Sequence, residues 1–157
     1  MTEKGFEPFR LRTNILLLQI LINGIYSLTM KTVCICGSRK FEPEIRKFAK
    51  ELNENGVVVY EPILNQDRRI DKLPVNLKRY SFLGLTHHHF NYIRKADVVY
   101  VFNKDGYLGN SGTMELGFAE ALGKPIYALS EDKEEPCRNV LFDEIIKTPK
   151  KLVKRLL

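Results

Sequence analysis

The sequence is poor in cysteine and histidine, and this excludes two common ways of stabilising a small domain. Its three cysteines are an odd number, and their spacing is typical of neither a disulfide framework nor a zinc site. Cys34 and Cys36 fall inside a short apolar run, so we interpret them as reduced core thiols of a cytoplasmic protein. The three histidines are consecutive, from His87 to His89. On a helix such neighbours point about 100° apart, so they do not converge on one ion, and we expect no bound metal.

The sequence also lacks an uninterrupted apolar segment long enough to span a bilayer. The segment Asn14–Leu28 is apolar, but Gln19 and Asn23 interrupt it, and it falls short of the ~20 residues that a spanning helix needs. No small-residue cleavage site of a signal peptide follows it. We expect residues 1–29 to be an extension outside the domain. A mis-assigned start before Met30 is the first interpretation, an amphipathic appendage the second and a membrane anchor the third.

Acidic residues are absent after Glu144, and this accounts for most of the formal net charge of +6. The basic residues of this tail are Lys147, Lys150, Lys151, Lys154 and Arg155. Cations near the end of a helix suit its dipole, whereas a nucleic-acid interface needs basic residues along one face, which the sequence before Lys147 does not have. We therefore expect neither nucleic acid nor a membrane as a partner.

From residue 31 to residue 157, short β-rich runs alternate with helical patterns in what we expect to be a single domain. The strand-like runs are 32–36, 57–63, 97–102, 124–129 and a fifth within 140–147. The run 57–63 is apolar apart from Glu61, and we expect a strand covered on both faces there. Alternating strands and helices predict an α/β fold with a doubly wound parallel sheet of about five strands between two helical layers, a three-layer sandwich.

Four segments outside these runs are expected to be helical, one of them the helix that follows the third strand and is closed by Gly123. The first begins near Pro43, ends at Gly56 and has one apolar face formed by Ile45, Phe48, Ala49 and Leu52. A second passes through 87–96, and Thr148 caps a last helix with Pro149 at its first position. The stretch Leu64–Leu85, with Asp67, Arg68 and Arg69, has no clean period, and we expect a lid or a contact to a second subunit there.

Three segments reach the edge where ligands bind in open α/β sheets, outside the carboxyl ends of the strands. They are "CGSRKF" after the first strand, "EPILNQ" after the second and "NKDGYLGNSGTME" after the third. Asp97 instead enters the third strand from the opposite edge, so we expect it to be a capping or turn residue.

Two of these loops offer groups that suit phosphate or sugar oxygens. Gly37 and Ser38 supply free amides and a hydroxyl, and Arg39 adds a cation. In the third loop, glycines let the backbone approach a ligand, and polar side chains supply hydrogen bonds; these residues are Gly109, Gly112, Asn110 and Ser111. We expect Glu115 in the first helical turn after this loop, where the dipole favours the ionised form that a carboxylate nucleophile needs.

The segment "ADVVYVFNKDGYLGNSGTMELGFAEALGKPI" resembles the signature of the nucleoside 2-deoxyribosyltransferase family, which includes nucleotide N-glycosidase relatives. "CGSRKF" and "HHHFNYIRKAD" extend the similarity over most of 31–129. The resemblance implies a flavodoxin-like fold, Glu115 as the nucleophile at the anomeric carbon of the sugar, and no cofactor. It also implies a homo-oligomer, with a homodimer as the default.

Two positions depart from the better-known members of that family. His89, eight residues before Asp97, stands where many have an active-site aspartate. We expect His89 to donate a proton to the leaving base or to orient Glu115. Gly109, six residues before Glu115, stands where the transferases have a base-binding aspartate and the nucleotide hydrolases a phosphate-binding serine.

The function implied by the resemblance is cleavage or transfer of the N-glycosidic bond of a nucleoside or a nucleoside 5′-monophosphate through a covalent intermediate. Ser38, Arg39, Asn110 and Ser111 would hold the sugar or its 5′ substituent, and Tyr107 would stack on the base or pack within its loop. One alternative is a nucleotide-sensing module of the same fold. Another is a relative of the lysine-decarboxylase-like cytokinin phosphohydrolases, whose G-T-x-E core also occurs here.

Overall fold

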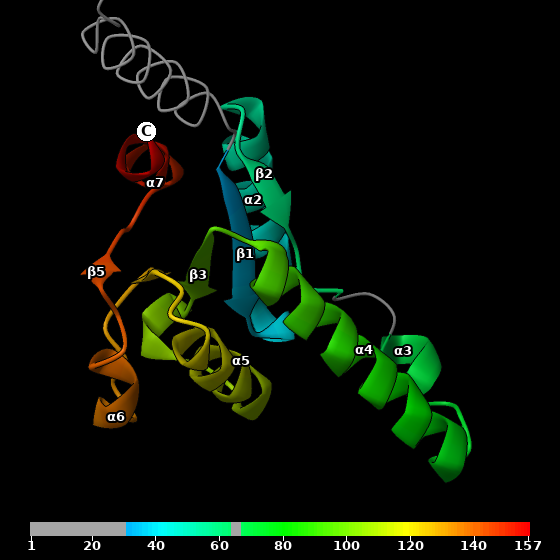
Figure 1. The fold of residues 1–157 in the computed structure, drawn as a ribbon. Helices are drawn as coiled ribbons and strands as arrows, with labels where there is room; N and C mark the ends of the chain where they lie inside the picture. Colours follow the sequence, from blue (N-terminus) through cyan, green and yellow to red (C-terminus); the bar gives the residue numbers. More distant parts are fainter. Residues whose placement is uncertain (1–30, 64–66) are drawn as a thin grey trace, which may run out of the picture. The chain divides into compact units, whose positions relative to one another are not determined.

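The strands of this protein form one parallel sheet. They are β1 (Thr32–Gly37), β2 (Val58–Tyr60), β3 (Val98–Phe102), β4 (Ile126–Ala128) and β5 (Glu144–Ile145). They lie side by side in the order β2-β1-β3-β4-β5. Figure 1 labels β2, β1, β3 and β5, which follow one another in this order across the view. The structure is a computed structural model that describes residues 31–63 and 67–157, so the expectations for residues 1–29 lie outside it. The strand order is that of flavodoxin-like folds and confirms the expected doubly wound α/β architecture.

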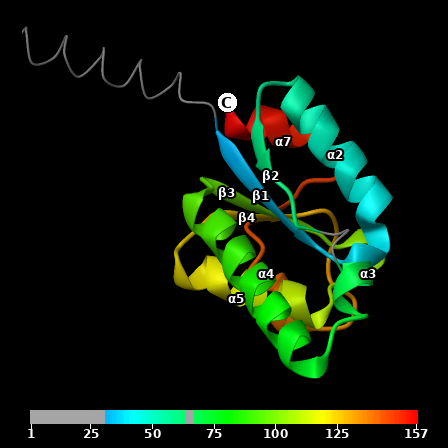
Figure 2. The same ribbon diagram turned by 90° about the vertical axis from the view of Figure 1, so that its right-hand side faces the viewer.

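Helices cover both faces of the sheet. The long ones are α2 (Glu42–Glu54), α4 (Val75–Lys95), α5 (Asn110–Ala121) and α7 (Pro149–Leu156). Short ones are α3 (Asp67–Ile70), α6 (Pro136–Asn139) and the 3-10 turns η1 (Arg39–Phe41) and η2 (Lys104–Gly106). Figure 2 shows α2 and α7 on one side of the sheet and α4 and α5 on the other, which confirms three layers. Within the described ranges, no helix is long and apolar enough to cross a membrane.

The alternation of side chains along β1 assigns its residues to two separate cores. Val33 and Ile35 belong to the cluster that includes the buried faces of α2 and α7. Cys34 and Cys36 point the other way, into the cluster beneath α4 and α5. All four side chains are fully buried, as expected for a central strand of a parallel sheet.

The helices over the first of these faces follow their sequence patterns closely. The buried residues of α2 are the four that were predicted, Ile45, Phe48, Ala49 and Leu52. In α7, Pro149 opens the helix and the Thr148 hydroxyl accepts a hydrogen bond from the Lys151 amide at 3.3 Å. Leu152 and Leu156 of α7 are then directed into the same core as α2.

Two expectations about the remaining elements are wrong. The run 57–63 is not an interior strand: β2 spans only Val58–Tyr60, lies at the edge of the sheet and is half-buried throughout. The stretch 64–85 is not irregular where the structure describes it, because α3 lies within it and α4 begins at Val75. The fifth strand lies within 140–147 as expected, at Glu144–Ile145, and it is preceded by α6, which was not predicted.

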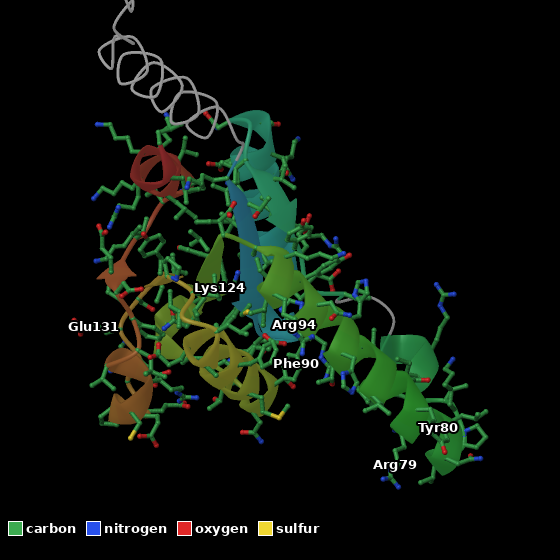
Figure 3. The ribbon with its side chains drawn as sticks, in the orientation of Figure 1. Arg79, Tyr80, Phe90, Arg94, Lys124 and Glu131 are labelled. Carbon is green, nitrogen blue, oxygen red and sulfur yellow. The ribbon has the colours of Figure 1, made fainter. Side chains whose placement is uncertain are left out.

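Helix α4 lacks an amphipathic period because only its second half packs on the body of the protein. His89 and Ile93 are its only buried residues. Phe90 stacks on Phe118 of α5 with a ring separation of 4.3 Å. In Figure 3 the labelled Phe90 lies beside α5, whereas Tyr80 lies at the far end of α4, which projects beyond the sheet. A helix that is exposed over half its length has no continuous apolar stripe, so its sequence pattern does not predict a helix.

Asp97 is a structural residue at the amino ends of β1 and β3. Its Oδ2 accepts hydrogen bonds from the amide and the hydroxyl of Thr32, at 2.8 and 2.9 Å. Its own amide donates to the Thr32 hydroxyl at 2.9 Å. The pair joins the two strands at the edge opposite the ligand-binding edge, in agreement with the turn role expected for Asp97.

We expect Tyr100→Phe to lower the free energy of unfolding by about 1–2 kcal/mol, measured by urea denaturation. The Tyr100 hydroxyl is fully buried and donates to the Ile146 carbonyl at 2.6 Å, and its removal leaves that carbonyl without this donor. Tyr80→Phe is the matched control, because Tyr80 is 69% exposed. Equal stability of the two variants would contradict a contribution from the Tyr100 hydrogen bond.

Candidate active site

A pocket of about 320 Å³ opens at the carboxyl ends of β1 and β3. The chain leaves β1 toward β2 on one side and leaves β3 toward β4 on the other, so this is the point where the strand order reverses. Ligands bind at such switch points in open α/β sheets, and the volume lies at the lower end of the range for small-molecule sites. The pocket walls include all ten predicted site residues: Gly37, Ser38, Arg39, His89, Tyr107, Gly109, Asn110, Ser111, Gly112 and Glu115.

The loop after β1 forms one polar wall of the pocket. Gly37 ends the strand where a Cβ atom would lie 2.9 Å from Ile45 Cδ1 and 3.2 Å from the Phe102 carbonyl oxygen, so only glycine fits without a shift. The Ser38 hydroxyl accepts from the Lys40 amide at 3.3 Å and caps η1. Arg39 is exposed at the rim.

The start of α5 forms the facing wall. Gly109 is the N-cap residue, and it has no side chain with which to cap the helix. The first amides of α5 therefore have no capping side chain at the pocket, where Asn110 and Ser111 also expose their polar groups. Backbone amides at a helix N-terminus favour an anionic ligand group such as a phosphate or carboxylate.

Tyr107 lies between these two walls. Its ring meets the Phe41 ring edge-on at 6.2 Å, and Lys40 Nζ lies 5.0 Å from its centre. Both the packing role and the ligand-facing role considered for Tyr107 are compatible with this position, because one side of the ring contacts Phe41 while the residue still lines the pocket.

A buried arginine, which sequence reasoning did not identify, holds the loop before α5. Arg138 of α6 donates through Nη1 to the Leu108 carbonyl at 2.7 Å and to the Thr113 hydroxyl at 3.0 Å. Its Nε forms an ion pair with Asp132 Oδ2 at 2.9 Å, and the two side chains are only 10% and 0% exposed. The sequence gives little indication of this role, because a single arginine in a short polar segment belongs to no recognisable motif.

The preceding turn is fixed by a second set of contacts. Asn103 is fully buried, and its side chain donates to the Ser130 carbonyl at 2.6 Å and accepts from the Ser130 amide at 3.0 Å. Gly106 has φ +79°, and a Cβ there would lie 2.8 Å from the Glu131 carbonyl oxygen. Glycine is therefore required at this turn by both backbone conformation and space.

Glu115 and His89 form a close pair on one side of the pocket. His89 Nε2 lies 3.5 Å from Glu115 Oε2, and the side chains are 8% and 16% exposed. Glu115 is the sixth residue of α5, so it lies in the second turn and not in the first, as was expected. His89 is buried and lines the pocket, so it is not a surface histidine.

Burial, more than the helix dipole, controls the ionisation of Glu115. Loss of hydration raises the pKa of Glu115 to about 7, although the charge of His89 and a hydrogen bond with Cys36 both lower it. The expectation that its surroundings favour the ionised form is therefore wrong. Burial also lowers the pKa of His89, but the hydrogen bond with Cys34 and the charges of Glu115 and Cys34 outweigh this, so it lies above 6.5.

The two thiols of β1 meet the same imidazole. His89 Nε2 lies 3.8 Å from Cys34 Sγ and 3.5 Å from Cys36 Sγ. The hydrogen bond with Cys36 lowers the pKa of Cys34 to about 6, against the effect of burial, while the pKa of Cys36 is raised. Sequence reasoning placed both cysteines in the core, where they are, but did not bring them to His89.

A further, largely apolar wall of the pocket comes from α4 and from the chain after β2, which belongs to the expected edge segment "EPILNQ". Helix α4 contributes Phe82, Leu85, Thr86 and His88, and the chain after β2 contributes Pro62 and Ile63. Apolar side chains opposite polar loops suit a ligand with one flat, weakly polar part and one hydroxylated or charged part.

Comparison with known proteins agrees with this architecture. The sequence profile of the family described as nucleoside 2-deoxyribosyltransferase matches residues 34–146, and the chain therefore belongs to that family. None of the curated proteins is similar enough in sequence to count as a relative.

Two solved structures share the fold. One is the 2-deoxyribosyltransferase of the psychrotolerant bacterium Bacillus psychrosaccharolyticus, 15% identical, with a TM-score of 0.56 over 78% of this chain and 90% of that one. The other is a conserved protein of Enterococcus faecalis V583, 12% identical, with a TM-score of 0.54 over 82% of this chain and 98% of that one. At these identities the likeness concerns the fold alone.

We expect Arg138→Lys to lower the free energy of unfolding by about 3 kcal/mol, measured by urea denaturation. Lysine cannot pair with Asp132 and also reach the Leu108 carbonyl and the Thr113 hydroxyl, so buried groups lose their partners. Arg155→Lys is the control: its pair with Glu144 is 3.0 Å long, but both side chains are about half exposed. That change is expected to cost less than about 1 kcal/mol. A similar loss of unfolding free energy in both variants would contradict a stabilising role for the buried contacts of Arg138.

We expect Glu115→Gln to stabilise the protein at pH 8 by about 2 kcal/mol and to have little effect near pH 5. Because burial raises the pKa of Glu115 from 4.5 to about 7, the wild type loses stability as the pH rises through this interval, and glutamine does not ionise. Thermal unfolding at both pH values measures the difference. The exposed Glu120 of the same helix supplies the control Glu120→Gln. A glutamine variant that is less stable at pH 8 would contradict the raised pKa.

Proposed function

We propose that this protein cleaves or transfers the N-glycosidic bond of a nucleoside or a nucleoside 5′-monophosphate, with Glu115 as the nucleophile. The observation that carries the proposal is the Glu115–His89 pair, 3.5 Å apart, in a pocket at the strand-order switch point of a chain of this family. A carboxylate nucleophile and a proton donor side by side are the two groups that displacement of a nucleobase requires.

The proposed reaction proceeds in two displacements. An oxygen of ionised Glu115 forms a bond to the anomeric carbon, the bond from that carbon to the base nitrogen breaks, and the nitrogen keeps the electron pair. Protonated His89 supplies the proton that neutralises the leaving base. Neutral His89 then takes a proton from water or from a second base as its oxygen or nitrogen attacks the anomeric carbon. The bond to Glu115 breaks, the carboxylate keeps the electron pair, and the sugar retains its original configuration.

The pKa shifts of Glu115 and His89 suit this proton transfer near neutral pH. With a pKa of about 7, an appreciable fraction of Glu115 is ionised there, and the raised pKa of His89 favours the protonated imidazole. Burial that raises the pKa of the carboxylate also leaves its ionised form poorly hydrated, and therefore more reactive.

The walls of the pocket suggest how a nucleoside would lie. We propose that Ser38, Arg39, Asn110 and Ser111 hold the sugar or its 5′ substituent, because they form the polar walls beside the amides of α5. The base would lie against Tyr107 and the apolar wall that includes Phe82. Gly109 offers no side chain to a base or a phosphate, so the specificity would rest on these other groups.

We further propose that the domain comprises residues 31–157 and acts as a homodimer in the cytoplasm, without nucleic-acid or membrane partners. The exposed apolar side chains of the projecting half of α4 support a self-association surface; they are Val75, Leu77, Tyr80 and Leu83. Reduced thiols support a cytoplasmic site, since the described cysteines are all free.

Base release from a panel of nucleosides and 5′-monophosphates, with and without a free acceptor base, tests the proposal. We expect wild type to release or exchange base with at least one compound, and Glu115→Ala to be slower by at least about 1000-fold. Glu120→Gln on the exposed side of α5 is expected to retain activity. Acid-quenched wild type should carry the mass of one glycosyl group, which Glu115→Ala should lack.

A folded wild type that is inert on every compound would refute the proposed chemistry. If it then bound one panel member in calorimetry, the protein would be a nucleotide-sensing module. The absence of an aspartate or serine at Gly109 is the observation that favours this second function.

A further inference from the structure

Two sulfur atoms and one imidazole nitrogen converge beneath the pocket, and the proposed reaction does not require both sulfurs. Cys34 and Cys36 are two residues apart in β1, so their side chains lie on the same face of the sheet. His89 reaches them from α4 on the layer above. The three potential ligand atoms lie within 4.8 Å of one another, and in the described ranges this is the only such group of His, Cys, Asp or Glu.

The spacing matches tetrahedral coordination of a borderline-soft divalent cation. Zn²⁺ lies about 2.3 Å from thiolate sulfur and about 2.0–2.1 Å from imidazole nitrogen, which at tetrahedral angles places sulfur and nitrogen about 3.6 Å apart. His89 Nε2 lies 3.5 Å from Cys36 Sγ and 3.8 Å from Cys34 Sγ. Both nitrogen-to-sulfur distances therefore differ from the tetrahedral value by no more than about 0.2 Å.

Glu115 is the nearest candidate for a fourth ligand, although it lies outside the group of three and would have to turn toward the thiols. Glu115 Oε2 lies 3.5 Å from His89 Nε2, close to the distance of about 3.3 Å between an oxygen and a nitrogen ligand on tetrahedral Zn²⁺. Glu115 and His89 line the pocket, whereas both cysteines are fully buried behind them. A metal ion would thus enter through the pocket and pass the carboxylate before it meets the thiols.

The spacing of these residues along the chain does not indicate a metal site, and neither the cysteines nor the consecutive histidines predicted one. Only His89 of that run is buried, and its partners are 55 and 53 positions earlier in the chain. A buried cysteine often serves simply as a small apolar residue. That role does not explain why two sulfurs of one strand contact the same imidazole nitrogen beside a buried carboxylate.

We propose that Cys34, Cys36, His89 and Glu115 bind one Zn²⁺ ion. Each thiol releases its proton on coordination, because the thiolate is the ligand. The ion and the glycosyl group then compete for the same carboxylate oxygen, so the metal-bound form is unable to use Glu115 as a nucleophile. The site itself does not depend on the proposed reaction, since its ligands are defined by geometry alone.

Zinc titration of metal-free, full-length protein against a chromophoric chelator tests the site. We expect one Zn²⁺ per chain in the wild type, and an affinity at least about 100-fold lower for Cys34→Ser and for Cys36→Ser. Cys137→Ser and His87→Asn are the matched controls, because both residues are exposed and outside the group, and they are expected to bind as wild type does. Co²⁺ should give sulfur-to-cobalt charge-transfer and tetrahedral d–d bands that Cys34→Ala lacks.

The titration contains no nucleoside, so its outcome is independent of base release. Circular dichroism establishes that each variant is folded, and Cys34→Ala and Cys36→Ala replace the serine variants if a buried hydroxyl prevents folding. Wild type that binds Zn²⁺ no more tightly than the folded cysteine variants would overturn the site. Glu115→Gln should weaken binding by at least about 10-fold; unchanged affinity would overturn the competition between metal and nucleophile.

Discussion

A carboxylate removed from water beside an imidazole is the constraint on which the rest of this structure depends. Glu115 is held within α5, His89 within α4, and the thiols that contact the imidazole within β1, so three separate elements must meet within a few ångströms. Burial works against the charge of Glu115, and only close partners offset it. The buried supports around the loop before α5, such as Arg138 and Asn103, are understandable in these terms, because a small displacement of α5 would separate the pair.

The two faces of the sheet bury cores of different composition. The core beneath α2 and α7 consists of aliphatic and aromatic side chains, with Ile45, Phe48 and Leu152 among its buried members. The core beneath α4 and α5 contains smaller residues and includes the two thiols of β1. Because side chains alternate along a strand, the same six-residue strand supplies Val33 and Ile35 to one face and reactive groups to the other. Burial of apolar surface beneath α2 and α7 supplies folding free energy that offsets the cost of burying the polar group formed by Glu115, His89 and the two thiols.

The sequence was sufficient wherever a local pattern matched a local structure. The apolar face of α2, the Thr148 cap and the loop residues around Glu115 were all readable, since each depends on neighbours in the chain. What failed depended on distant contacts. Helix α4 has no period because half of it is unsupported, and the raised pKa of Glu115 arises from burial that no local motif encodes. The contact between Cys36 and His89 joins residues 53 positions apart, so no local sequence pattern predicts it.

The projecting half of α4 has a consequence for how proteins of this kind diversify. Phe82 and Leu85 form part of the pocket wall, yet the half of the helix that bears them contributes no buried residue to either core. Substitutions at these positions are therefore expected to cost little folding stability, whereas substitutions at the buried His89 or Cys36 are expected to cost much more. Ligand preference can therefore change along one helix while the buried groups of the pocket stay constant.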